Sequence, residues 1–67
     1  MRDLLVCKTP EGRFHSIEIR RGDEIVEFFI DDKFHGQVRV EDLVETLRAI
    51  IGHLGEHGWT VRRVKTP

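Results

Sequence analysis

Apolar residues recur at helical spacing in the second half of the chain, between segments that alternate like strands. The recurring positions are Leu43, Val44, Leu47, Ile50, Ile51 and Leu54. This spacing predicts one amphipathic helix that begins near Val40 and ends at Gly55 or Gly58. Because such a helix is long enough to cover one face of a small sheet, the pattern favours an α+β domain.

The remaining segments have the alternation or the apolar content that is typical of β-strands. Polar turns that contain Pro, Gly or Asp separate them. The expected strands are residues 4–8, 13–21, 24–30, 34–38 and 59–64. These elements predict a single domain over residues 1–67 with the order β-β-β-β-α-β, an antiparallel sheet of four to five strands with the helix packed on one face. The sheet edge that the last strand joins is left open.

The third expected strand is apolar on both of its faces. Ile25 and Phe29 point to one face, and the other apolar residues of the strand point to the opposite face. One helix covers one face, so we expect Phe14 to lie beside Ile25 and Phe29 on the uncovered face. Clustered exposed apolar area usually marks an interaction surface. The pattern predicts a protein interface at Phe14, Ile25 and Phe29. The alternatives are that the last strand or the loops cover this face, or that these are scattered surface apolar residues without a function.

Length and composition narrow the functional classes. A chain of 67 residues forms one small core and has no room for a deep enclosed pocket. The single cysteine, Cys7, excludes an internal disulfide and fits a reducing compartment, and its apolar neighbours favour a structural thiol over a nucleophile. No apolar run approaches the roughly 20 residues that span a bilayer. We therefore expect a cytoplasmic protein that does not contact a membrane.

Arginine and aromatic residues suggest an alternative function. The candidate residues are Arg20, Arg21, Trp59, Arg62 and Arg63. On a sheet, such residues can bind single-stranded nucleic acid through phosphate contacts and base stacking. In element order, four strands followed by a helix resemble the single-strand-binding fold of a transcriptional coactivator, and the resemblance implies that activity. The formal net charge of −1 argues against it, and the arginines can instead pair with carboxylates such as Glu18 and Glu27.

Candidate metal-binding and catalytic groups are few. His53 and His57 have the i, i+4 spacing of zinc sites, but Gly55 lies between them and is expected to break the helical geometry. The adjacent aspartates Asp31 and Asp32 are typical turn formers. We therefore predict no catalytic residue, no metal and no cofactor.

The predicted function is non-catalytic binding. The expected partner is a second copy of the chain or another protein, held through the uncovered sheet face. The alternative function is a single-stranded nucleic-acid-binding or DNA-associated regulatory module, and binding that weakens steeply with salt would distinguish it from apolar association.

Overall fold

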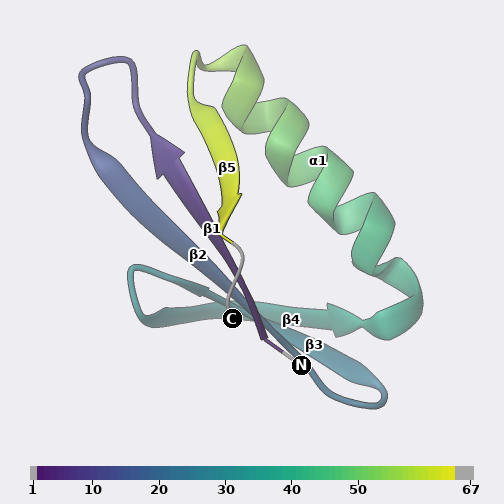
Figure 1. Cartoon of the computed structure of the whole chain (residues 1–67). Helices are drawn as coiled ribbons and strands as arrows, with labels where there is room; N and C mark the ends of the chain where they lie inside the picture. The colour runs from purple at the N-terminus through teal and green to yellow at the C-terminus, as the bar shows by residue number, and fades with distance from the viewer. Residues whose placement is uncertain (1, 65–67) are drawn as a thin grey trace.

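The computed structural model describes residues 2–64 (Figure 1). Strands β1 (Arg2–Lys8), β2 (Phe14–Arg21), β3 (Ile25–Ile30) and β4 (Lys33–Arg39) come first. The short 3-10 helix η1 (Val40–Asp42), the helix α1 (Leu43–Glu56) and strand β5 (Thr60–Val64) follow. This order confirms the predicted β-β-β-β-α-β arrangement.

The strands form one antiparallel 5-stranded sheet in the order β4-β3-β2-β1-β5. The first four make a meander, and β5 joins the free edge of β1, with Cys7 opposite Val61. This pairing identifies the edge that the sequence leaves open. Because every neighbouring pair is antiparallel, β4 and β5 run in the same direction on opposite edges. Helix α1 connects these two edges (Figure 1).

The turn between β3 and β4 is a two-residue hairpin loop. Ile30 pairs with Lys33, and the loop residues Asp31 and Asp32 have φ values of 49° and 67°. Positive φ at both central positions is typical of a type I′ turn, whose twist matches that of the flanking strands. Aspartate tolerates this region because its short side chain can bond nearby backbone groups. The turn was expected from the sequence, and it brings the Asp31 carboxylate beside β2.

The core lies on the sheet face that α1 covers. Its buried apolar side chains come from three strands and are Leu5, Cys7, Ile17, Ile19, Val26 and Phe28. The helix adds the partly buried Leu43, Leu47, Ile50 and Leu54. None of the 14 residues of α1 is fully buried, and the helix contacts mainly the edge strands β5 and β4. The helix therefore bridges the sheet and packs loosely over its middle.

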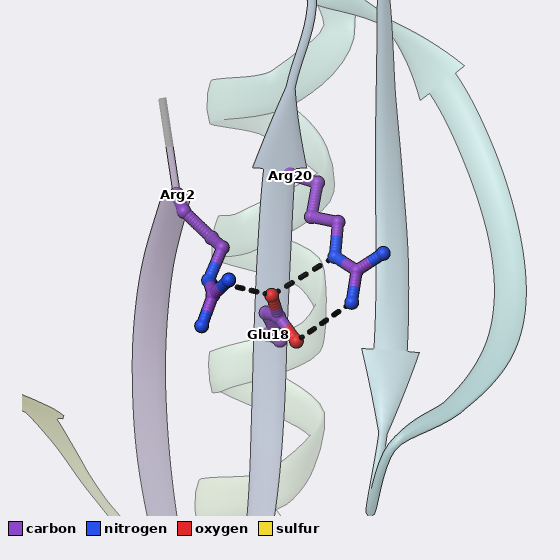
Figure 2. Close-up of polar contacts among 3 residues, drawn as sticks. All are labelled: Arg2, Glu18 and Arg20. Carbon is purple, nitrogen blue, oxygen red and sulfur yellow. Dashed lines mark hydrogen bonds and ion pairs between the residues drawn. The ribbon is translucent and has the colours of Figure 1, made fainter.

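The opposite side of the sheet, which we call the open face, carries the alternate residues of each strand. In Figure 2 the helix lies behind the sheet, and Arg2, Glu18 and Arg20 project from the front. Within residues 2–64, no helix packs on this side.

Candidate protein-interaction surface

Cross-strand pairing arranges the open face in transverse rows. One row, here called the central row, crosses all strands of the 5-stranded sheet, since each of its members lies opposite the next in register. Its members are Phe34, Phe29, Glu18, Leu4 and Val64. With about 4.8 Å between neighbouring strands, the row is roughly 19 Å long. It is an apolar band with a carboxylate in its middle.

Aromatic contacts hold one half of the central row. The ring centroids of Phe29 and Phe34 are 5.7 Å apart in an edge-to-face arrangement, which is a preferred geometry for aromatic pairs. The Arg20 guanidinium lies over the Phe29 ring, 4.0 Å from its centroid. Phe34 still has 55% of its surface exposed, so this half of the row presents an ordered apolar ring to solvent.

Glu18 occupies the middle of the central row and is nearly buried, with 11% of its side chain exposed. Arg2 and Arg20 each reach its carboxylate at 2.9 Å (Figure 2). The hydrogen bond from Arg20 and the charges of both guanidinium groups lower the pKa of Glu18, and burial opposes them. The charge at the centre of the apolar band is therefore compensated within the chain.

The interface residues predicted from the sequence lie on the open face but not in one cluster. Phe29 is in the central row. Phe14 is four positions along β2 from Glu18, and Ile25 is four positions along β3 from Phe29, toward the other end of the sheet. At about 3.3 Å per residue, each lies roughly 13 Å from the central row. The expected side-by-side arrangement of Phe14 with the other two is wrong, because the register separates them.

The residues predicted for nucleic-acid binding are divided between the two sides of the sheet. Arg20 and Arg62 lie on the open face, opposite Glu27 and Val6. The other members of the set are on the side that faces α1, namely Arg21, Trp59 and Arg63. Arg63 donates there to Asp3 at 2.9 Å. A single-strand-binding surface needs its cations and aromatic rings to converge, and the five predicted residues do not share one side of the sheet.

Arg62 and Phe14, which the sequence placed in two different predicted sites, lie together with Lys8 at the β1–β5 edge of the open face. We call the hollow that they line the basic hollow. Its volume is about 340 Å³, and it is lined by Val6, Lys8, Phe14, Thr60, Arg62 and Val64. The Lys8 ammonium lies 5.7 Å from the Phe14 ring centroid, and 66% of Phe14 is exposed. Its members come from three strands, so only the strand register could have revealed it.

On the helix side, His15 and Asp31 form a hydrogen bond that was not predicted from the sequence. His15 Nδ1 donates to the Asp31 carboxylate at 2.7 Å across 16 residues of sequence. The backbone N–H of Ser16 donates to the same carboxylate at 3.0 Å. The bond from His15, followed by that from Ser16, lowers the pKa of Asp31. The His15 ring stacks on Trp59 with centroids 5.3 Å apart.

Cys7 lies directly opposite His15 in the β1–β2 register and is fully buried. A cysteine, a histidine and an aspartate thus lie near one another, as in some nucleophilic enzymes. Burial, and then the negative charge of Asp31, raise the pKa of the Cys7 thiol. A reactive cysteine needs the opposite shift, because the thiolate is the nucleophile. The arrangement favours a structural thiol.

The histidines at the end of α1 lie closer together than expected. The helix continues through Gly55 to Glu56, and the ring centroids of His53 and His57 are 4.5 Å apart. The expectation that Gly55 breaks this geometry is wrong, since the His57 N–H still reaches the His53 carbonyl at 3.3 Å. Among residues 2–64, no group of three or more His, Cys, Asp or Glu residues could hold a metal ion.

The 14-residue helix α1 is short. In the part of the chain that the structure describes, no helix is long and apolar enough to cross a membrane. Comparison of the chain with family models, curated proteins and solved structures finds no match.

Proposed function

We propose that the protein is a non-catalytic interaction protein that forms a homodimer through the open face of its sheet. The observation that carries this proposal is the central row, which crosses the whole sheet with apolar side chains on both sides of the paired Glu18. Exposed apolar area of this kind usually marks an interaction site. A two-fold dimer would pack this row against the same row of a second copy, as self-complementary interfaces do.

The charges near the central row suit a second copy of the chain. Arg2 and Arg20 compensate Glu18, and Arg20 also lies opposite Glu27. Like charges that face each other across an interface oppose association. Because Glu18 is paired with Arg2 and Arg20 within each chain, two central rows would meet without an unpaired carboxylate between them. A domain of this size also gains stability from a partner subunit.

A charge placed in the central row tests the proposal. We expect the wild type to sediment as a dimer and Phe29→Glu as a folded monomer, because an unpaired charge in an apolar contact is strongly unfavourable. Phe34→Glu should act in the same way at a more exposed ring. Val44→Glu is the matched control, since Val44 is 59% exposed on α1 and should leave the dimer intact. Sedimentation velocity and circular dichroism on the same samples give both readouts.

Two results would contradict the proposal. A wild type that remains monomeric at the highest concentration would exclude self-association through this face. Dissociation by Val44→Glu, with no effect of either phenylalanine variant, would move the interface to the helix. Should Phe29→Glu unfold, the more exposed Phe34→Glu decides the question.

Single-stranded nucleic-acid binding is a second candidate, favoured by the basic hollow. Lys8 and Arg62 flank the exposed Phe14 there, and within residues 2–64 neither cation forms an ion pair. An exposed ring between two cations can stack on a base while the cations contact phosphates. The hollow lies at one end of the open face, so this function would use a smaller surface than the dimer.

A further inference from the structure

A groove lies between α1 and the sheet, on the side opposite the open face. Its volume is about 410 Å³, which falls within the roughly 300–1,000 Å³ of ligand sites. Most of its lining is apolar and comes from both layers of the fold: Cys7, Ile17, Ile30, Ile50, Leu54 and Trp59. A single-domain chain of this size therefore holds a concave apolar site without enclosing it.

The loose packing of the helix explains the groove. Figure 1 shows α1 running from the end of β4 to the start of β5, and its contacts are mainly with these edge strands. Ile50 and Leu54 consequently remain only partly buried. Protein interiors are normally filled to high density, and covering exposed apolar surface is favourable at about 25 cal/mol per Å². An apolar ligand in the groove would complete the packing of the helix on the sheet.

Polar side chains gather at one end of the groove. Lys33 and His35 come from β4, and the hydrogen-bonded pair of His15 and Asp31 lies beside them. His35 reaches this side through a bulge in β4, where Phe28 pairs with Gly36 and Phe29 pairs with Phe34. Bulges often redirect a side chain next to a functional site.

One cation at this end of the groove, Lys33, is available to an anionic ligand. The Asp31 carboxylate already accepts hydrogen bonds from His15 and from the Ser16 N–H. Lys33 forms no ion pair with any of residues 2–64. An entering anion would thus meet the Lys33 ammonium and the His35 ring, and the nearby Asp31 carboxylate is held in place by its hydrogen bonds to His15 and Ser16.

We infer that the groove binds a small amphipathic carboxylate. The apolar body of the ligand packs between Trp59 and the helix residues Ile50 and Leu54, and its carboxylate lies at Lys33 and His35. The stacked rings of His15 and Trp59 provide a rigid wall for the ligand. The groove and the open face are on opposite sides of the sheet, so ligand binding and dimerisation use separate surfaces.

Trp59 is the only tryptophan in the chain, so its fluorescence reports on the groove directly. Decanoate and decanol, each below its aggregation concentration, are suitable probes because they share a chain and differ in charge. We expect decanoate to change the fluorescence of Trp59 saturably and to bind about tenfold more tightly than decanol, the value of a hydrogen bond to a charged group. Lys33→Gln should remove that preference. Lys8→Gln, on the open face, is the matched control and should preserve it.

A groove-filling variant, Ile50→Phe, should weaken the binding of both probes while the circular dichroism spectrum is retained. Equal affinity for decanoate and decanol in the wild type would overturn the assignment of an anionic ligand. No saturable change with either probe would overturn the groove as a ligand site. Fluorescence of Trp59 that depends on protein concentration without ligand, and is unaffected by decanoate, would assign the groove to a second copy of the chain instead.

Discussion

Glu18 is a nearly buried, charged residue on the open face. Its carboxylate is almost covered although it lies on the side of the sheet without a helix, and the side chains of Arg2 and Arg20 flank it on both sides (Figure 2). A nearly buried carboxylate without such partners would be costly. The arginine–carboxylate pairing that the sequence offered as an alternative to nucleic-acid binding is therefore present at Glu18.

Replacing Glu18 with Gln tests this charge through the pH dependence of stability. The pKa of Glu18 is lowered in the folded chain, so its ionised form stabilises the fold above the ordinary glutamate pKa of about 4.3. This stabilisation is lost as the pH falls through the lowered pKa of the folded state. We expect the wild type to be more stable than Glu18→Gln near neutral pH and the difference to vanish in acid. Urea unfolding across a pH series measures it.

The pKa of Asp31 is also lowered in the folded chain. Ionised Asp31 therefore makes the stability of the fold fall in acid as well, and its contribution must be separated from that of Glu18. The Glu18→Gln change should therefore be repeated in an Asp31→Asn background, where the same loss of pH dependence is expected. A difference in unfolding free energy that stays constant with pH would show that Glu18 acts through packing alone.

At the scale of elements, alternation and helical spacing predict the strands and the helix, because both patterns are local. The loose packing of α1 on the sheet cannot be predicted from a local sequence pattern. It follows from β5 joining β1, which places the ends of the β4–α1–β5 connection on opposite edges of the sheet. Because β4 and β5 run in the same direction, the end of β4 and the start of β5 also lie at opposite ends of the strands, with Arg39 opposite Ile25 and Thr60 opposite Lys8. The 14-residue helix, about 21 Å long, therefore crosses the sheet diagonally from one edge strand to the other, and the groove lies beneath it.

Truncation of Leu47 tests whether α1 packs on the sheet. It packs against the core cluster from the middle of α1 but is only partly buried. We expect Leu47→Ala to lower the free energy of unfolding by about 2 kcal/mol, the low end of the range for leucine truncation. Val44→Ala, at an exposed position of the same helix, should change it by less than about 0.5 kcal/mol. Urea unfolding of both variants provides the measurement, and equal small effects would contradict the packing of α1 on the sheet.

For the whole molecule, the formal net charge of −1 conceals an uneven distribution. On the open face the strands carry the basic residues Arg2, Lys8, Arg20, Arg39 and Arg62 and the acidic Glu18 and Glu27, and Asp32 of the β3–β4 turn lies beside Arg2 and Glu18. Acidic side chains instead precede and begin α1, at Glu41, Asp42 and Glu45. The sequence could not separate these groups, because the face of each residue depends on the register. The strand register is also the reason why the residues predicted for nucleic-acid binding lie on two sides of the sheet.

The distribution of charged and aromatic residues over the two sides of the sheet predicts weak binding of nucleic acid. We expect no measurable binding of a labelled single-stranded oligonucleotide at near-physiological salt, as followed by fluorescence anisotropy. The carboxylates of the open face compensate part of its positive charge, and Trp59 lies on the other side of the sheet. Base stacking and phosphate contacts therefore lack a shared surface outside the basic hollow.

The basic hollow makes that expectation specific. Micromolar binding that weakens steeply with added salt would indicate phosphate contacts and would contradict the expectation. Loss of such binding in a Lys8→Ala, Arg62→Ala double variant would place it in the hollow and favour the nucleic-acid function over the dimer. Arg63→Ala is the matched control, because Arg63 is paired with Asp3 on the helix side. An equal loss of oligonucleotide binding in Arg63→Ala would instead show that binding depends on the total charge of the protein and not on a specific site in the hollow.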